Sequence, residues 1–328
     1  MINKIFFILV ISLFLLDFKG LNILYNIYKV FKNYNYLNIF IIAHKDFKTS
    51  INNRFYKILC DEIYQFKNKY KLSIIESKNN NELFFKKIGY SEGSKIYYVW
   101  KQYKKNIFKS KYVGFNHYRR IFSFGNNIPN LDDIFKDYDI ILNKHSNLPY
   151  SLQKHYYLYH NKDDIDEILE IIKYKFPQYY SIANETLNSN LFYLGNIFIM
   201  KKKDFIKYGN FTFEILFEFD KRHNLKKDDD IKNYVNKNYN KYKRFNINHQ
   251  RRLEGFLMER ISNIFYNYNC KKKYEISLVS NNYLYSDIKK KKNSKMFLIL
   301  EIIIIIIFLF YLYIFLFLKI EKEKKKIL

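Results

Sequence analysis

Short apolar runs alternate with segments of helical periodicity through the middle of the chain. The runs with the length of strands are Leu37–Ala43, Leu72–Glu76, Lys111–Phe115, Tyr138–Leu142 and Asn196–Met200. Helical spacing of apolar residues predicts helices over 52–70, 94–104, 163–174, 203–219 and 251–267. The Lys- and Asn-rich stretch 225–243 reads as a loop. This alternation predicts an α/β domain over residues 38–285 with a largely parallel sheet, whose ligands bind beyond the carboxyl ends of the strands.

The C-terminal pattern is that of a membrane span. Met296–Leu318 is a run of 23 residues with one charge, Glu301, and six consecutive isoleucines. At 1.5 Å per residue, a helix of this length crosses a hydrocarbon core of about 30 Å. A basic linker (286–295) and a basic tail (319–328) flank the run. Because both flanks are positive, the positive-inside rule leaves the orientation open.

The first 37 residues form an apolar extension of a different kind. Ile5–Leu16 is a 12-residue apolar run, shorter than a full span, and no small-residue cleavage site follows it before Asp17. This run is either a signal anchor, and then a second membrane segment, or a helix that lies on the domain or on the bilayer. The side of the membrane on which the main domain lies depends on which alternative holds.

The charge composition limits the classes of binding partner. The formal net charge is +26, from 57 Lys and Arg against 31 Asp and Glu, so nucleic acid, anionic lipid and phosphorylated small molecules are all electrostatically suitable. The excess is mostly lysine spread along the chain, without zinc-finger spacing or a ribonucleoprotein aromatic motif, and we therefore expect no nucleic-acid partner. Cys60 and Cys270 form neither a metal motif nor a disulfide framework.

Polar and charged residues follow the apolar run Tyr112–Phe115. His117 and Tyr118 are followed by Arg119 and Arg120. Adjacent guanidinium groups are fixed cations that can bind phosphate or carboxylate bidentately, and imidazole titrates near neutrality. The segment either brings charge to a phosphate-binding pocket or is an edge strand whose arginines pair with surface acids. In the same way His44 and Lys45 follow the first predicted strand.

Five blocks in order resemble the glycosyltransferase-like domain of unknown function 4422, a family common in bacterial capsule and O-antigen gene clusters. The blocks are Ile39–Lys45, Glu92–Lys101, Tyr112–Phe122, Asn196–Lys201 and Arg252–Arg260. The last block has the family's Arg-x-x-Gly-Phe-x-x-Glu-Arg pattern, whereas Tyr98 replaces a tryptophan in the second block and Ile197 a methionine in the fourth. The resemblance covers residues 38–269 and excludes the two terminal extensions.

The resemblance implies a GT-A-like fold, with a mixed, mostly parallel sheet flanked by helices. It also implies transfer of a sugar from a nucleotide-sugar donor to a glycan or lipid-linked acceptor in surface polysaccharide synthesis. Such a reaction needs positive charge for the departing diphosphate and, in an inverting enzyme, a base for the acceptor hydroxyl. The catalytic candidates are Glu259 and His117. The donor-binding and phosphate-binding candidates are His44, Lys45, Tyr118, Arg119, Arg120, Asn196, Arg252 and Arg260.

A metal site is not evident. GT-A enzymes usually hold Mn²⁺ or Mg²⁺ with Asp-x-Asp after an apolar strand, but the comparable strand here ends in His117. Asp137 and Asp139 form a literal Asp-x-Asp that precedes an apolar run, which favours a structural position. Asp228–Asp230 reads as a solvated part of the lysine-rich loop. We therefore favour arginines in the place of the cation, with Mn²⁺ or Mg²⁺ as the alternative.

Several assignments have a structural alternative. Glu259 and Arg260 are either a base with its orienting partner or an ion pair that fixes a helix, and Asn196 is either a sugar contact or a strand-end turn. We expect Glu92 to cap the helix that follows it. Trp100 is expected in the core and His160 on the surface.

At the level of the whole protein, the alternative to a transferase is a catalytically inactive, membrane-anchored protein that binds glycans or nucleotide sugars. With a cytosolic donor, the domain would be cytoplasmic and the chain anchored once, near its C-terminus. The partners would then be the donor, the acceptor and membrane lipids.

Overall fold

The computed structural model describes residues 35–281, apart from 67–69, 80, 239 and 241–245. The chain divides into two compact units, residues 1–47 with 51–279, and residues 48–50 with 280–328. The predicted apolar segments Ile5–Leu16 and Met296–Leu318, the basic linker and the basic tail lie outside the described residues. Within the described ranges, no helix is long and apolar enough to cross a membrane.

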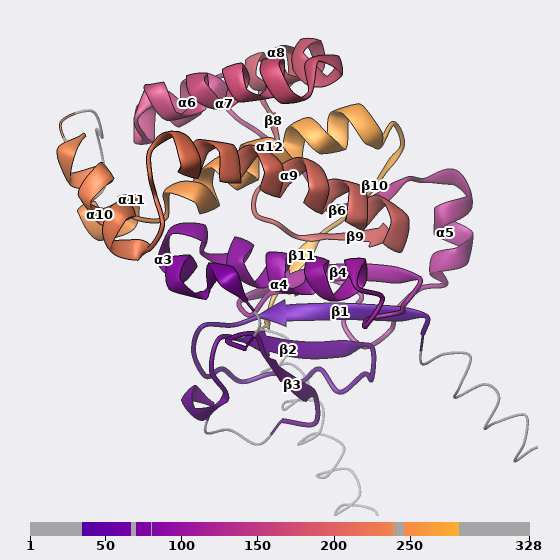
Figure 1. Cartoon of the computed structure of the whole chain (residues 1–328). Helices are drawn as coiled ribbons and strands as arrows, with labels where there is room; N and C mark the ends of the chain where they lie inside the picture. The colour runs from indigo at the N-terminus through magenta and orange to yellow at the C-terminus, as the bar shows by residue number, and fades with distance from the viewer. Residues whose placement is uncertain (1–34, 67–69, 80, 239, 241–245, 282–328) are drawn as a thin grey trace, which may run out of the picture. The chain divides into compact units, whose positions relative to one another are not determined.

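A mixed sheet forms the centre of the first unit (Figure 1). Its main path has the order β10-β6-β9-β4-β1-β2-β3. Along this path β9 is antiparallel to β4 and β6, and the other neighbouring pairs are parallel. The strands of the path are β1 (Leu37–Ile42), β2 (Tyr56–Cys60), β3 (Ser73–Glu76), β4 (Tyr112–His117), β6 (Ile140–Asn143), β9 (Phe198–Lys201) and β10 (Lys273–Ile276).

Four short strands complete the sheets. β5 (Arg120–Phe122) pairs with β4 and with β11 (Leu278–Ser280), whereas β7 (Ser146–Asn147) and β8 (Leu191–Phe192) form a separate small sheet. Every residue of β1 is buried, as expected for a parallel strand covered on both faces. The α/β prediction with a mostly parallel sheet is confirmed.

Helices cover the sheet and build a further layer above it in Figure 1. α9 packs against α4 and α12, and α12 also contacts α3 and α8. The helical elements are η1 (Ile63–Gln65), η2 (Glu82–Lys86), α3 (Lys87–Tyr90), α4 (Glu92–Lys104), α5 (Leu131–Asp137), α6 (Leu152–Tyr159), α7 (Lys162–Lys175), η3 (Pro177–Tyr179), α8 (Tyr180–Asn188), α9 (Lys202–Arg222), α10 (Asp228–Lys237), α11 (Ile247–Gln250) and α12 (Leu253–Asn269).

Trp100 lies in the core, as predicted. Its side chain is buried between α4 and α9, and its indole N–H donates to the carbonyl of Ile206 at 3.1 Å. Gly209 makes this approach possible, because a Cβ at that position would lie 2.0 Å from a ring carbon of Trp100.

Two predicted elements were wrong. Instead of a helix over 52–70, the chain forms strand β2, in which Ile58, Leu59 and Cys60 are consecutively buried. A strand covered on both faces shows no alternation, so its apolar positions can match a helical period by chance. The stretch 225–243 is not a loop throughout, because α10 buries Ile231 and Val235 at a spacing of one helical turn.

Candidate active site

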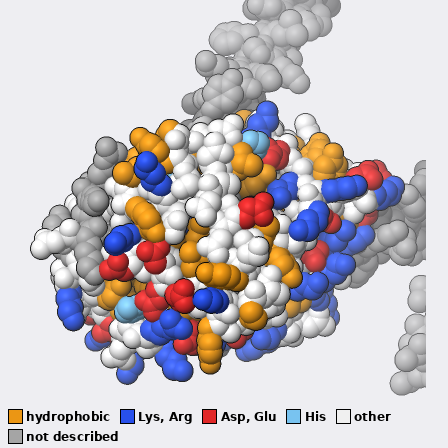
Figure 2. Space-filling view, turned by 90° about the horizontal axis from the view of Figure 1, so that it is seen from above, with side chains coloured by type: hydrophobic (Ala, Val, Ile, Leu, Met, Phe, Trp, Pro, Cys, Tyr) orange, Lys and Arg blue, Asp and Glu red, His pale blue; other side chains and the backbone are white. Residues whose placement is uncertain are grey.

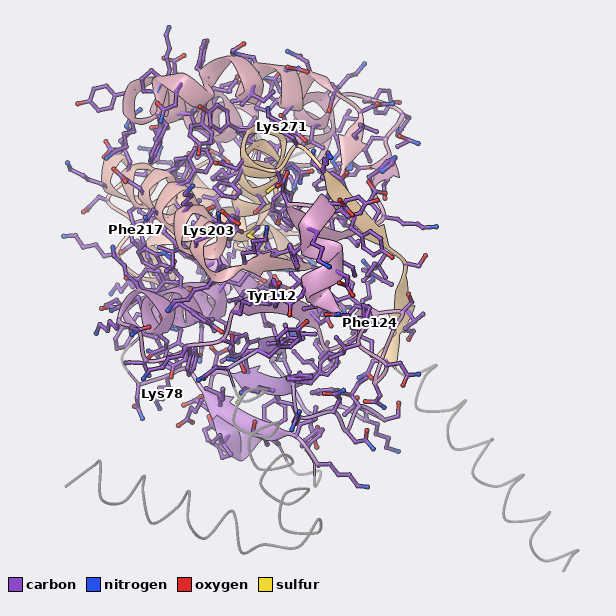
Figure 3. All side chains as sticks on the ribbon, turned by 90° about the vertical axis from the view of Figure 1, so that its right-hand side faces the viewer. Lys78, Tyr112, Phe124, Lys203, Phe217 and Lys271 are labelled. Carbon is purple, nitrogen blue, oxygen red and sulfur yellow. The ribbon has the colours of Figure 1, made fainter. Side chains whose placement is uncertain are left out.

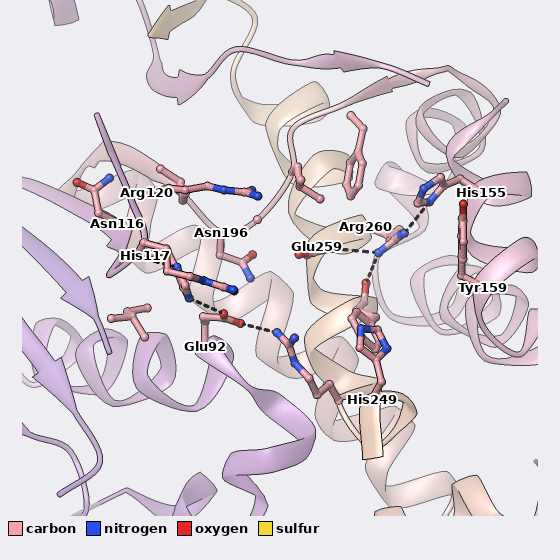
Figure 4. Close-up of a pocket in the computed structure, with 18 of the residues that line it drawn as sticks. Glu92, Asn116, His117, Arg120, His155, Tyr159, Asn196, His249, Glu259 and Arg260 are labelled. Atoms are coloured by element: carbon pink, nitrogen blue, oxygen red, sulfur yellow. Dashed lines mark hydrogen bonds and ion pairs between the residues drawn. The ribbon is translucent and has the colours of Figure 1, made fainter. Parts of the chain in front are cut away.

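A pocket of about 420 Å³ opens where β1 and β4 end (Figure 4). Ile42 and His117, the last residues of these strands, lie in its wall. The site therefore lies at the carboxyl edge of the sheet, as the sequence predicts. The side chains that line it and enter the argument are Glu92, Arg119, Arg120, Asn196, Arg252, Glu259 and Arg260.

A second pocket of about 400 Å³ adjoins the first. Glu92, His117, Arg119 and Arg252 line both pockets and form the boundary between them. His44 lines the second pocket. The cavity also contains Asp61 and Lys95, whose carboxylate and ammonium lie 2.7 Å apart.

Most of the predicted site residues come together here, with two exceptions. Tyr118 is buried behind the second pocket, where its hydroxyl and Nε2 of His44 lie 3.3 Å apart. Lys45 lies 6.0 Å from the centre of the Tyr118 ring and lines neither pocket.

Glu92 is a pocket residue that reads from the sequence only as a helix cap. It is the first residue of α4, and its carboxylate accepts hydrogen bonds from the Ser91 hydroxyl at 2.7 Å and from Arg252 at 3.4 Å. Burial raises the pKa of Glu92, but the Arg252 cation and the Ser91 hydroxyl outweigh that effect and hold the pKa below its usual value. Glu92 is therefore an ionised partner for Arg252 at neutral pH.

His117 is neutral and its tautomer is fixed. Nδ1 accepts the backbone N–H of Arg119 at 3.1 Å, so the ring proton is on Nε2, which lies 3.7 Å from Oε1 of Glu92. Burial lowers the pKa of His117 to about 4, although the charge of Glu92 acts in the opposite direction. At neutral pH the imidazole can donate a hydrogen bond from Nε2, and its other nitrogen is already engaged.

Ser91 has a strained backbone beside the pocket. Its φ of 52° and ψ of −121° lie in a region that side-chain-bearing residues rarely adopt. Its hydroxyl accepts hydrogen bonds from Nε and Nη2 of Arg252 at 3.2 and 2.8 Å. Gly255 allows α12 to approach closely, since a Cβ there would lie 3.0 Å from Cβ of Ser91. The strained turn thus holds Arg252 against the pocket.

Glu259 and Arg260 form the ion pair that the sequence allows. Nη1 of Arg260 lies 3.1 Å from the Glu259 carboxylate and also donates to the Phe256 carbonyl, while Nη2 is 3.1 Å from Nδ1 of His155. Burial raises the pKa of Glu259 above its usual value even though Arg260 lowers it. Burial also lowers the pKa of His155 to about 4, so the ring is neutral at neutral pH and its Nδ1 can accept a hydrogen bond from the Arg260 guanidinium.

Asn196 lines the pocket, and a hydrogen bond holds its side chain in place. Its Oδ1 accepts the Ser262 hydroxyl of α12 at 3.0 Å. Gly195, just before it, has a φ of +77°, a backbone conformation that glycine adopts without strain. Asn196 precedes β9, which begins at Phe198, so the predicted strand started two residues too early.

His160 is buried and is not a surface residue. Its ring stacks on Phe256 with 4.3 Å between centroids, and its Nδ1 lies 2.8 Å from the side-chain oxygen of Gln250. Both partners lie on elements nearly a hundred residues away in the sequence. The pattern around His160 could therefore not reveal its burial.

The pocket's carboxylates do not suit a divalent metal. Glu92 and Glu259 are each engaged with an arginine, whereas Mg²⁺ and Mn²⁺ need several free oxygen ligands. Among the described residues, no group of three or more His, Cys, Asp and Glu side chains could hold a metal ion.

The aspartate candidates lie elsewhere. Asp137 ends α5, and Asp139 precedes β6, at the edge of the sheet opposite the pocket, where it accepts the backbone N–H of Lys272. Asp228 begins α10 and accepts the backbone N–H groups of Ile88 and Gly89, so Asp228–Asp230 does not lie in a loop.

Comparison with known proteins gives a family and a fold. The family model described as "Domain of unknown function (DUF4422)" matches residues 38–272. No curated protein matches the chain. The apo structure of the bifunctional glycosyltransferase WbbM is similar, with a TM-score of 0.55 and 21% identity over 74% of this chain and 45% of that one. This chain therefore spans less than half of that structure, and the similarity establishes the fold.

Proposed function

The chain belongs to the family described as domain of unknown function DUF4422, and we propose that it is a glycosyltransferase. It would move a sugar from a nucleotide-sugar donor to a glycan or lipid-linked acceptor in surface polysaccharide synthesis. One observation carries the proposal. Four guanidinium groups and a carboxylate of raised pKa line one pocket at the carboxyl edge of the sheet. The fold shared with a glycosyltransferase supports it.

The arginines suit the departing diphosphate. When the bond between the anomeric carbon and the diphosphate oxygen breaks, negative charge develops on that oxygen. Arg119, Arg120 and Arg252 line the pocket and supply fixed positive charge there. Arg252 is held by Ser91 and Glu92, so it is oriented before the donor binds. These cations would do the work that Mn²⁺ or Mg²⁺ does in other GT-A enzymes.

Glu259 is the better candidate for the base of an inverting transfer. A general base must bind a proton well, and burial raises the pKa of the Glu259 carboxylate above its usual value. It would take the proton of the acceptor hydroxyl while that oxygen bonds to the anomeric carbon. His117 cannot take this role in its present tautomer, because Nδ1 is engaged and Nε2 carries the proton. We assign His117 to hydrogen-bond donation from Nε2.

The predicted C-terminal span at 296–318 would tether the enzyme once, with a cytoplasmic domain that meets cytosolic donors. Such an anchor would keep the transferase at the membrane in which a lipid-linked acceptor is held. The lipid of the acceptor would then be anchored in the same bilayer as the enzyme.

Calorimetric titration of the full chain in detergent micelles with EDTA tests the donor site. We expect a nucleoside diphosphate to bind and the corresponding nucleoside to bind far more weakly. Arg252→Met should weaken diphosphate binding about tenfold to a hundredfold, since a hydrogen bond to a charged group contributes about 1.5–3 kcal/mol.

Arg222→Met is the matched control, because Arg222 pairs with Glu167 and Glu218 on the surface and lines neither pocket. Equal effects of the two variants, or no binding of any nucleoside diphosphate, would refute the assignment.

A further inference from the structure

Lysines gather at the amino edge of the sheet, opposite the pocket. β1 and β4 begin in register, Leu37 beside Tyr112, and Tyr112 pairs with Lys201 at the end of antiparallel β9. Across β9, Met200 pairs with Ile140, the first residue of β6, which pairs with Lys273 of β10. The pairing register therefore places the residues that flank these strand ends in one row.

We call this row and the adjoining helix ends the basic edge. Its lysines are Lys104, Lys105, Lys109, Lys111, Lys136, Lys201, Lys202, Lys203, Lys207, Lys271, Lys272 and Lys273. Its acids are Asp132, Asp133, Asp137, Asp139 and Asp204. Figure 3 looks onto this edge, with Lys203, Tyr112 and Lys271 labelled. In Figure 2, Lys and Arg side chains gather at the corresponding right-hand margin.

Pairing within the basic edge leaves most of its lysines available. Lys111 pairs with Asp132 and Lys136 with Asp133. The Asp139 carboxylate accepts the backbone N–H of Lys272. Twelve lysines thus face five aspartates, of which two already have a lysine partner. The edge is strongly positive.

An apolar side chain projects from the basic edge. Ile107 is 59% exposed in the turn between α4 and β4, flanked by Lys105 and Lys109. An exposed isoleucine among lysines is the combination that binds the interface of an anionic bilayer, where the apolar group inserts and the ammonium groups meet phosphates.

The chain also reaches this edge from its apolar extension. The described residues begin at Asn35, whose carbonyl accepts the backbone N–H of Lys111 at 2.8 Å. The 34 residues before it carry the apolar run Ile5–Leu16 and connect to the domain in the middle of the lysines. A membrane segment in that extension would bring this edge to the bilayer.

We propose that the basic edge docks on an anionic lipid bilayer, with the lysines on the head groups and Ile107 at the interface. Docking requires no catalytic activity, so this proposal can be tested independently of the proposed function. If that function also holds, the pocket faces away from the membrane. β1 has six residues, which at 3.3 Å per residue separate its ends by about 20 Å. The acceptor would then be the distal end of a lipid-linked glycan chain.

Site-specific fluorescence quenching on the full chain tests this proposal. Lys109→Cys places a polarity-sensitive dye at the basic edge, and Lys144→Cys places it after β6 at the carboxyl edge. Cys60 and Cys270 are buried, so the introduced thiol takes the label. The protein is reconstituted into phosphatidylcholine vesicles, with or without phosphatidylglycerol, that carry a head-group nitroxide quencher.

We expect quenching at Lys109→Cys only in anionic vesicles, reversal by salt, and no quenching at Lys144→Cys. The triple variant Lys203→Glu, Lys207→Glu and Lys271→Glu should weaken docking by a factor of at least about a hundred. Each lysine near an anionic surface contributes about 1 kcal/mol of binding free energy, and the variant removes three of them. The matched control reverses Lys154, Lys162 and Lys173, which are exposed on α6 and α7.

Equal quenching at both label sites, equal quenching in neutral vesicles, or equal loss in the two triple variants would overturn the proposal. So would a response of the Lys109→Cys label to single-stranded RNA without one to anionic vesicles, because the edge would then bind nucleic acid.

Discussion

Arg260→Met tests the buried ion pair at the base of the pocket. The Arg260 side chain is 2% exposed and that of Glu259 20%. The substitution removes the contacts of the guanidinium with Glu259, the Phe256 carbonyl and His155. It leaves a carboxylate that burial already disfavours, so the pKa of Glu259 should rise further.

The size and sign of the effect follow from that pKa. Removing one partner of a buried pair costs about 3–5 kcal/mol, and we expect the lower end because Glu259 keeps some exposure. A carboxyl whose folded pKa lies above its unfolded value contributes its stability fully below about pH 4.3 and loses it as the pH rises through the folded pKa. Arg260→Met should therefore be destabilised more at pH 8 than at pH 5.

Urea unfolding of the full chain in detergent micelles measures this, followed by the fluorescence of Trp100, the chain's one tryptophan. Adding Glu259→Gln to Arg260→Met should recover stability at pH 8, since no charge is then stranded. Arg222→Met, in a partly exposed pair, should cost less than about 1 kcal/mol. An equal loss at both pH values, or a double variant no more stable than Arg260→Met, would refute the reasoning.

Three further outcomes are expected. Ser91→Gly should be more stable than Ser91→Ala by about 1 kcal/mol in urea unfolding, because both lose the hydroxyl but only glycine relieves the positive φ. Acid should destabilise the fold below about pH 6.5, where unfolded histidine protonates, because burial lowers the folded pKa of His117 to about 4 and of His160 to about 3. His160→Gln should flatten that slope in the pH dependence of the urea midpoint, and an unchanged slope would count against this explanation. Asp137→Asn with Asp139→Asn should change kcat in a transfer assay by less than about twofold, since neither residue lines the pocket; a large fall would restore them as metal ligands.

The elements that position the site were predictable because each carries a complete local signal. β1 and β4 are apolar runs that end in polar residues, and α12 has helical periodicity over 17 residues. β2 lacked such a signal, because it has only five residues and Lys57 interrupts its apolar positions. α10 could not be recognised in the sequence, because polar and charged residues surround its two buried positions, Ile231 and Val235.

The missed site residues depend on contacts between distant segments. Glu92 reads as a cap until α12 brings Arg252 against it from 160 positions along the chain. The contact of Ser91 with Gly255 and the burial of His160 against Phe256 likewise depend on the packing of α12. The sequence did contain a signal for a functional role of Glu92. This residue is the first of the family block Glu92–Lys101, and a charged carboxylate there does not contribute to the apolar core.

Turnover in the presence of a chelator shows whether this pocket catalyses sugar transfer without a metal. The full chain in detergent micelles is incubated with a panel of nucleotide sugars, with EDTA or with Mn²⁺, and release of nucleoside diphosphate is measured. We predict turnover that survives EDTA and that falls about 10²–10⁴-fold in Glu259→Gln, the contribution typical of a general base. No turnover with any donor, turnover that requires Mn²⁺, or an unimpaired Glu259→Gln would contradict it.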